Sequence, residues 1–399
     1  MRKWTIPVLL LLAQGALAQT MLPDPDALDA FLDDAVDNTH IPGLVALATD
    51  ADGNFYSHAS GERNVAEGQS MTMDTVFRIA SMTKPVTSAA VMVLVDDGRV
   101  GIDDPIERHM PELADRTVFV RFNGDAVESV PAATPITVRH LLTHTSGLGY
   151  TFSNATLARM IGNSGTRATA HPLVHEPGTR WTYGESTRVL GELVERVSGQ
   201  GLEDFMRERI FEPLGMTETS YSVAPAALGR VATIHRMTDD GLVEGPNGDS
   251  VVSPQNGDGG LNSTAEDYAK FIRLFLNDGV APNGQRLISE ASIAAMGRNH
   301  IGDVRVSLQE ATAAAVSLDF PLGAGTDTFS LGFQITESDN GPGRSRGSMA
   351  WAGIFNTEFW IDPASGIGGV LLMQYLPFYD DAAIDTLVQW EQRLYDQLP

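Results

Sequence analysis

The chain has 399 residues, of which 43% are apolar and 20% are charged, as in ordinary globular proteins rather than disordered or fibrous ones. Its formal net charge of -24 would be repelled by phosphate backbones, so we expect no nucleic acid among its partners. Because the chain contains no cysteine, it has no disulfide, no thiolate nucleophile and no cysteine-ligated metal.

The N-terminus has the pattern of a secretory signal peptide. Arg2 and Lys3 precede a short apolar run over residues 6–13, and a small-residue cleavage site ends at Ala18. An uncleaved membrane helix is the alternative interpretation, but the run is too short for a stable membrane anchor. We therefore expect cleavage after Ala18 and a mature protein that is periplasmic or extracellular.

Strand patterns occur near both ends of the chain, and helix patterns occur between them. Residues 44–48 and 54–58 predict two strands joined by a hairpin turn at Asp52-Gly53, followed by a polar stretch to Asp74. The apolar spacing of helices recurs over residues 83–97, 138–143, 185–197, 202–210, 265–276, 290–296 and 386–397. Strands are predicted again over residues 329–336, 348–354, 358–362 and 369–374.

This distribution predicts an α+β protein rather than alternating βαβ units. We expect one antiparallel sheet, built from both chain ends and flanked by helices, with a mainly helical domain inserted into it. The expected boundaries are a signal peptide over residues 1–18, sheet-domain parts over 19–80 and 296–399, and the helical domain over 81–295.

An S-x-x-K tetrad, Ser81 to Lys84, opens the helix expected at residues 83–97. Residues three apart lie on one helix face, so the Lys84 amine can reach the Ser81 hydroxyl. A serine hydroxyl is a poor nucleophile until a neighbouring base or cation eases its proton loss, and a helix N-terminus favours the oxyanion that follows. Alone, such a tetrad recurs by chance, as a capping serine beside a solvated lysine.

Four further segments accompany the tetrad. They are LLTHTSGL at residues 141–148, PGTRWTY at 177–183, EPLGM at 212–216 and GGLNST at 259–264. Together they resemble the serine β-lactamase and D,D-peptidase superfamily from about residue 25 onward, and most closely the class C β-lactamase-like family VIII carboxylesterases. The resemblance implies a β-lactamase/transpeptidase-like fold and acyl-enzyme chemistry on Ser81.

The second motif of this superfamily is Y-x-N, and here it is matched by Tyr183-Gly184-Glu185. The resemblance implies that Tyr183 helps to shuttle the serine proton together with Lys84. The asparagine that contacts the amide side chain of a lactam substrate is replaced by Glu185, which we expect at the substrate and which disfavours a β-lactamase.

The third motif, K-T-G in lactamases, is replaced by Trp351-Ala352-Gly353, as in family VIII esterases. The glycine lets the strand backbone approach the acyl group, whereas the cation that would hold a penicillin or peptide carboxylate is missing. By resemblance, the backbone N–H groups of Ser81 and Ile354 form the oxyanion hole. Trp351 is expected in the pocket wall, although aromatic residues in strands are usually core.

Other patterns compete for a functional role. Ser345 lies in a G-x-S-x-G pattern, but an α/β-hydrolase needs a later catalytic histidine and the last one here is His300, so we interpret Ser345 as a loop residue. His140 and His144 have zinc-like spacing but lack the glutamate of H-E-x-x-H, and we expect His144 to bond the loop backbone near residues 146–147.

His171 and His175 share that spacing, but Pro172 disfavours a regular helix through both. We therefore predict no metal and no cofactor. Tyr150, which follows the LLTHTSGL segment, resembles a pocket-lining tyrosine of the family.

The function predicted is an exported serine carboxylesterase that cleaves small short-chain esters through Ser81, with weak β-lactamase side activity. Whether Lys84 or Tyr183 is the general base stays open. The alternatives are a β-lactamase or D,D-peptidase and, from another class, a non-catalytic penicillin-recognising protein, which the intact Ser81, Lys84 and Tyr183 disfavour.

Overall fold

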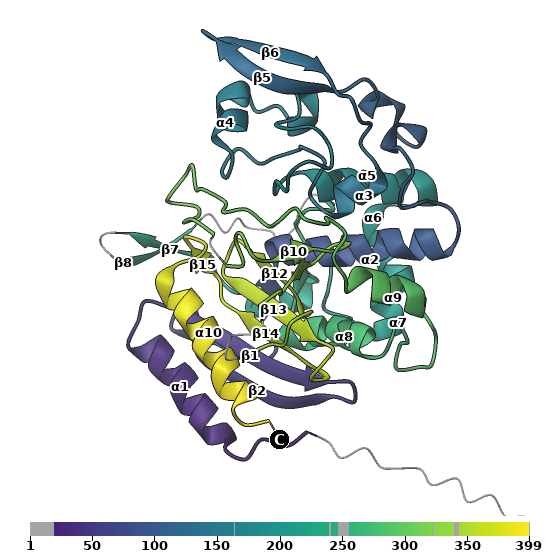
Figure 1. Cartoon of the computed structure of the whole chain (residues 1–399). Coiled ribbons are helices and arrows are strands. Elements are labelled where there is room, and N and C mark those ends of the chain that lie inside the picture. Colours follow the sequence, from purple (N-terminus) through teal and green to yellow (C-terminus); the bar gives the residue numbers. More distant parts are fainter. Residues whose placement is uncertain are drawn as a thin grey trace, which may run out of the picture.

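The computed structural model describes residues 20–162, 164–238, 241–245, 255–320, 322–338 and 343–398. The predicted signal peptide lies outside these residues. Figure 1 shows a sheet with two long helices in the lower half of the molecule and a helical and loop-rich part above it. None of the helices in the described ranges is both long and apolar enough to cross a bilayer.

The main sheet has eight strands and joins the two ends of the chain, as predicted. Its order is β10-β11-β12-β13-β14-β1-β2-β3, and every neighbouring pair is antiparallel. The strands are β1 (Gly43–Asp50), β2 (Asn54–Asn64), β3 (Gln69–Ser70), β10 (Thr328–Phe329), β11 (Gln334–Ile335), β12 (Met349–Gly353), β13 (Thr357–Asp362) and β14 (Ile367–Leu372). The join is the pairing of β1 with β14.

The sheet separates two hydrophobic cores. Successive residues of a strand point to opposite faces, so Leu47 faces the larger core and Ala46 the smaller one. The smaller core lies under α1 (Pro25–Asp37) and α10 (Asp381–Tyr395), which pack against each other. This arrangement explains why β1 is buried along its whole length.

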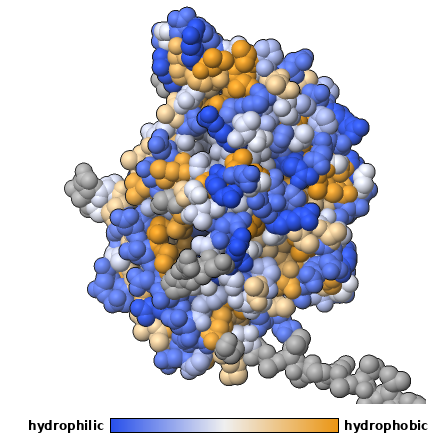
Figure 2. Space-filling model, viewed as in Figure 1, coloured by the Kyte–Doolittle hydropathy of each residue, from blue (hydrophilic) through white to orange (hydrophobic). Residues whose placement is uncertain are grey.

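The larger core contains α2 (Thr83–Asp96), a helix whose residues are buried from Thr83 to Leu94. It packs against α5 (Ser186–Ser198), while α8 (Ala265–Leu276) packs on the sheet. The other helices are α3 (Val138–Leu142), α4 (Ala155–Ile161), α6 (Leu202–Met206), α7 (Glu212–Leu214) and α9 (Glu290–Met296). Figure 2 shows polar and apolar residues interspersed over one face of the molecule.

Three smaller sheets are present within the described residues. Their strands are β4 (Phe77–Arg78) with β9 (Asn262–Ser263), β5 (Thr117–Asn123) with β6 (Ala126–Pro131), and β15 (Tyr375–Leu376) with β7 (His235–Thr238) and β8 (Gly241–Glu244). The pair β4–β9 matters for function, because it fixes the chain just before Ser81.

Several predicted elements were wrong in extent. The single strand expected at residues 329–336 is the hairpin β10–β11, because Gly332 adopts a positive φ of 115° that turns the chain. The last helix begins at Asp381, where the Asp380 side chain accepts a hydrogen bond from the Ala382 N–H. The polar stretch before Asp74 contains the end of β2 and all of β3.

Candidate active site

Ser81 lies in a short 3-10 turn, Ala80–Met82, that leads directly into α2. The turn is fixed from behind, because the Ile79 N–H donates to the Leu261 carbonyl at 3.0 Å. Ala80 has a φ of 46°, a left-handed conformation that an alanine adopts only when its surroundings impose it. The half-buried Ser81 hydroxyl is therefore presented from a rigid backbone.

Two side chains converge on that hydroxyl. Lys84 Nζ lies 3.0 Å from Ser81 Oγ, and the Tyr183 hydroxyl donates to the same oxygen at 2.7 Å. Lys84 comes from the first turn of α2, whereas Tyr183 lies 102 residues from Ser81 in the loop before α5. The structure thus brings together the three residues that the motifs predicted as catalytic.

The surroundings of these groups set their protonation. Burial lowers the pKa of Lys84 to about 7, although the nearby Asp258 charge raises it and the Arg188 charge lowers it further. Burial raises the pKa of Tyr183, and the hydrogen bond with Ser81 only partly opposes that shift. Near neutral pH the amine is therefore neutral in a large fraction of molecules, while the phenol keeps its proton.

Asp258 connects the groups behind Ser81, and the sequence analysis missed it. Its backbone carbonyl accepts a hydrogen bond from Lys84 Nζ at 2.5 Å, and its carboxylate accepts one from the Tyr150 hydroxyl at 2.5 Å. Arg188 Nε lies 3.4 Å from the same carboxylate, which is buried. In the sequence, Asp258 stands between two glycines and resembles an ordinary turn residue.

Strand β12 closes the site from the other side. A side chain on Gly353 would overlap the Ile79 carbonyl oxygen, so glycine is what allows the strand to approach the turn that carries Ser81. Ile354 follows directly and lines the same small cavity as Ser81. The oxyanion hole formed by the N–H groups of Ser81 and Ile354 stays a prediction.

The cavity at Ser81 has a volume of about 30 Å³ and an aromatic wall. The wall contains Tyr183, Trp351, Phe152 and Phe320. The Trp351 ring centroid lies 5.0 Å from that of Tyr183, with the two rings tilted by 58°. None of the described residues that line this cavity carries a formal charge.

Tyr150 and Glu185 are not among the described residues that line this cavity, and their contact with substrate stays a prediction. The Tyr150 ring packs edge-on against Tyr183 at 5.2 Å and holds Asp258, so it supports the site from behind. The Glu185 carboxylate forms an ion pair with Arg167, whose Nε lies 3.3 Å from Glu185 Oε2.

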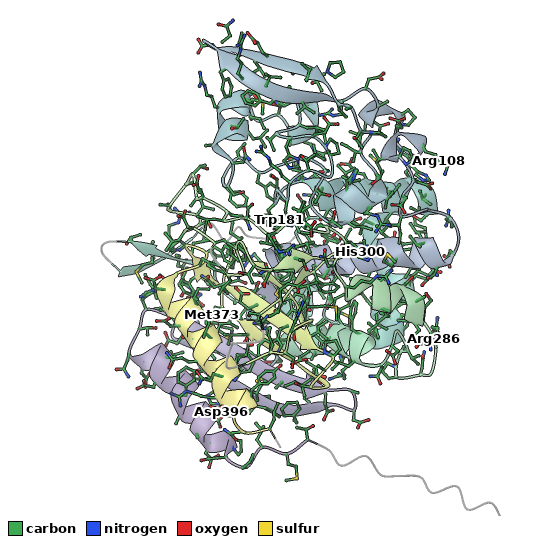
Figure 3. All side chains as sticks on the ribbon, viewed as in Figure 1. Arg108, Trp181, Arg286, His300, Met373 and Asp396 are labelled. Carbon is green, nitrogen blue, oxygen red and sulfur yellow. The ribbon has the colours of Figure 1, made fainter. Side chains whose placement is uncertain are left out.

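His144 is surrounded by aromatic rings, among them Trp181, which lies near the middle of the molecule in Figure 3. Its expected bond to the loop backbone was wrong, since Nε2 lies 3.5 Å from the Thr187 hydroxyl and Nδ1 has no partner among the described residues. Burial lowers its pKa well below the usual value, so the ring stays neutral.

Ser345 lies in a loop, as predicted. Its hydroxyl contacts that of Ser365 at 3.3 Å, and the chain continues into strand β12 instead of the helix that a nucleophile elbow requires. Within the ranges that the structure describes, no group of three or more histidine, aspartate or glutamate residues could hold a metal ion.

Comparisons with known proteins agree with this geometry. A family model described as Beta-lactamase matches residues 28–394. Protein Rv1367c of Mycobacterium tuberculosis is 33% identical over 90% of this chain and 92% of its own. The lovastatin esterase of Penicillium rubens is 31% identical over 92% and 98%, respectively. The solved LovD9 mutant of simvastatin synthase from Aspergillus terreus has a TM-score of 0.80 at 28% identity, covering 94% of this chain and 99% of that one.

Proposed function

The chain belongs to the Beta-lactamase family and is an enzyme of the serine hydrolase or acyltransferase kind, and from this premise we propose that it is a carboxylesterase for short-chain esters. The observation that carries the proposal is Ser81 Oγ, which bonds Lys84 and Tyr183 inside a cavity whose described lining residues are all uncharged. Such a lining suits a neutral ester and offers nothing to a substrate carboxylate.

In the first half-reaction, the neutral Lys84 amine accepts the Ser81 proton as Ser81 Oγ attacks the ester carbonyl carbon. Lys84 is a better base than Tyr183, because burial lowers the pKa of the amine to about 7 and raises that of the phenol. The negative charge on the carbonyl oxygen is held by the N–H groups of Ser81 and Ile354. Tyr183 donates its proton to the departing alkoxide and regains one from Lys84.

In the second half-reaction, water attacks the acyl-enzyme and gives its proton to the same pair of residues. The carbonyl–Ser81 bond then breaks, Ser81 Oγ is reprotonated, and the carboxylic acid leaves. No group beyond Ser81, Lys84, Tyr183 and the two backbone donors is needed for these steps. We also propose that the protein is exported, on the signal-peptide pattern over residues 1–18.

A substrate panel tests the choice of ester. We expect clear kcat/KM on nitrophenyl acetate and butyrate, weak turnover of a chromogenic cephalosporin and none of a D-Ala-D-Ala peptide. Without a cation at position 351, a carboxylate substrate loses a charge-assisted hydrogen bond, which corresponds to about ten- to a hundredfold in rate. A cephalosporin that matched nitrophenyl butyrate would instead favour a β-lactamase. Failure of a fluorophosphonate to label Ser81 would favour a non-catalytic binding protein.

Acyl transfer to an alcohol is the second candidate, because similar proteins over most of the chain are named transferases. The monacolin J acid methylbutanoyltransferase of Aspergillus terreus is 28% identical over 91% of this chain. Both reactions share the Ser81 acyl-enzyme and differ only in what attacks it. Adding butanol to the nitrophenyl butyrate assay and measuring butyl butyrate against butyrate separates them. Ester as the main product at low butanol would make the protein a transferase.

The acid limb of the pH profile should reflect the pKa of the Lys84 amine. Activity needs the neutral amine, so kcat/KM should rise with pH through about 7 and then level off. The charges that act on Lys84 are those of Asp258 and Arg188. Replacing Asp258 with asparagine removes the charge that favours protonated Lys84 and leaves Arg188, so the limb should move to lower pH. A limb that moved upward or stayed in place would contradict Lys84 as the base.

A further inference from the structure

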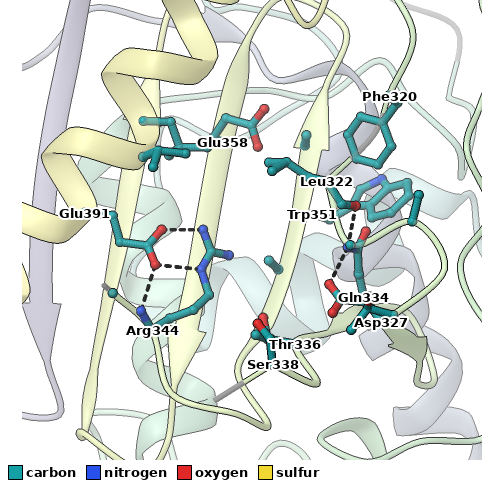
Figure 4. Close-up of a pocket in the computed structure, with 18 of the residues that line it drawn as sticks. Phe320, Leu322, Asp327, Gln334, Thr336, Ser338, Arg344, Trp351, Glu358 and Glu391 are labelled. Carbon is teal, nitrogen blue, oxygen red and sulfur yellow. Dashed lines mark hydrogen bonds and ion pairs between the residues drawn. The ribbon is translucent and has the colours of Figure 1, made fainter. Parts of the chain in front are cut away.

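A second cavity, of about 370 Å³, lies on the α10 face of the main sheet (Figure 4). Its floor contains Ala350 and Ala352 of β12, and Leu387 and Val388 of α10 form part of its side. Ala350 and Ala352 are alternate residues of the strand, so both point to the same face, and their small side chains leave space that larger ones would fill. The volume is that of a small-molecule site.

One acidic side chain in this cavity has no explained role. Glu358 projects from β13, where it pairs across the sheet with Ala352, and its Oε1 is buried with no partner among the described residues. Burial raises its pKa well above the usual value; the Glu391 charge adds to this and the Arg344 charge opposes it. This shift favours the protonated carboxyl, which can donate a hydrogen bond.

Arg344 supplies a second donor. Its Nε and Nη2 bind the Glu391 carboxylate at 2.9 and 2.5 Å, and its backbone N–H binds the same carboxylate at 2.8 Å. These bonds fix the guanidinium, which lies 5.2 Å from the Trp360 ring. Its Nη1 makes no hydrogen bond with any described residue. Figure 4 shows Arg344 and Glu358 on neighbouring sides of the same hollow.

Two other polar side chains of the cavity, Asp327 and Gln334, are paired with each other. The Asp327 carboxylate accepts hydrogen bonds from Gln334 Nε2 at 2.7 Å and from the Glu337 N–H at 3.1 Å. Burial raises the pKa of Tyr379 well above its usual value, so it stays neutral. Arg344 and Glu358 thus place two donors in the wall of the cavity, and a ligand can pair with both of them only through acceptors.

We propose that this cavity is a second binding site, for a small monocarboxylate whose two oxygens accept hydrogen bonds from Arg344 and Glu358. A carboxylate provides two acceptors and an apolar chain that fits against Leu387 and Val388. An ammonium ligand provides only donors and would require Glu358 to ionise against its burial. Carboxylates are also the products of the proposed esterase reaction, but the site itself does not depend on that function.

The test is calorimetric titration of sodium butyrate into protein whose Ser81 has been capped with a fluorophosphonate. Capping is needed because both cavities share Phe320, Trp351 and Ala352. If capping fails, the Ser81→Ala variant with nitrophenyl butyrate as competitor replaces it. We expect a single saturable site of millimolar affinity, and the absence of saturable binding would overturn the proposal.

Two variants locate the bound butyrate. Glu358→Leu should weaken binding about tenfold or more, whereas Glu358→Gln keeps a donor and should bind within a few-fold of wild type. Asp385→Asn, at an exposed position of α10, is the matched control. If Glu358→Leu fails to fold, Ala350→Leu fills the floor of the cavity and should abolish binding instead. Butyrate that binds Glu358→Leu or Ala350→Leu as it binds wild type would overturn the proposal.

Two further probes test the ligand class. Butylammonium chloride and butyramide carry the same chain as butyrate with a cationic and a neutral head. Both should bind more weakly than butyrate by about tenfold, since neither offers two acceptor oxygens to the two donors. Tighter binding of butylammonium, lost in Glu358→Leu, would show a cation site and overturn the assignment.

Discussion

Replacing Ser81 with alanine should lower kcat for nitrophenyl butyrate by about 10⁴-fold or more, because it removes the atom that forms the acyl-enzyme. The loss should be in catalysis and not in folding. The Ser81 side chain is small and half-buried, so its removal leaves little cavity and the melting temperature should stay near that of wild type. Stopped assays with purified variant, together with circular dichroism melts, measure both quantities.

Ser345 provides the matched control for this experiment. Its hydroxyl forms a hydrogen bond only with Ser365 among the described residues. Ser345→Ala should therefore keep the wild-type kcat and should be labelled by a fluorophosphonate to the same extent as wild type. If Ser345→Ala lost activity and Ser81→Ala kept it, Ser345 would be the nucleophile and the proposed mechanism would be wrong.

Local patterns predicted the elements whose determinants lie close in sequence. The helices α8 and α9 begin and end where apolar spacing placed them, because Thr264 and Ser289 cap their first turns. Ser81 and Lys84 meet through the geometry of one helical turn, which the tetrad itself encodes. Tyr183 was found only through a family motif, since no local rule connects residues 102 positions apart.

The features that escaped prediction depend on the tertiary structure. Helix α1 begins at Pro25 behind an Asp24 cap, a signal that the sequence analysis overlooked. Arg167 reaches Glu185 from another loop, and no local pattern in the sequence indicates that ion pair. Asp258 and Glu358 both look like ordinary surface acids in the sequence. Asp258 is important because it is buried next to Lys84, and Glu358 because it lies next to the alanine floor of the second cavity. Both surroundings are created by tertiary packing, which a local sequence pattern does not encode.

Replacing Lys84 with methionine should lower kcat by about 10²- to 10⁴-fold, the range for loss of a positioned general base. Methionine has a similar shape without the amine, so the fully enclosed site should still pack. The variant loses the hydrogen bond to the Asp258 carbonyl, but it also avoids the free-energy cost of burying an amine. The two effects on stability offset each other, and a thermal melt measures the net change. Lys84→Arg should not restore activity, because a guanidinium stays protonated at every assay pH.

The comparison with Tyr183→Phe decides which residue is the base. Burial lowers the pKa of Lys84 to about 7 and raises that of Tyr183, so the amine takes the proton and the phenol passes it to the leaving group. Nitrophenolate leaves readily without a proton, whereas ethoxide needs one. Tyr183→Phe should therefore impair ethyl butyrate hydrolysis more than nitrophenyl butyrate hydrolysis, while Lys84→Met should impair both alike. Equal losses for both esters in Tyr183→Phe, larger than those in Lys84→Met, would assign the base to Tyr183.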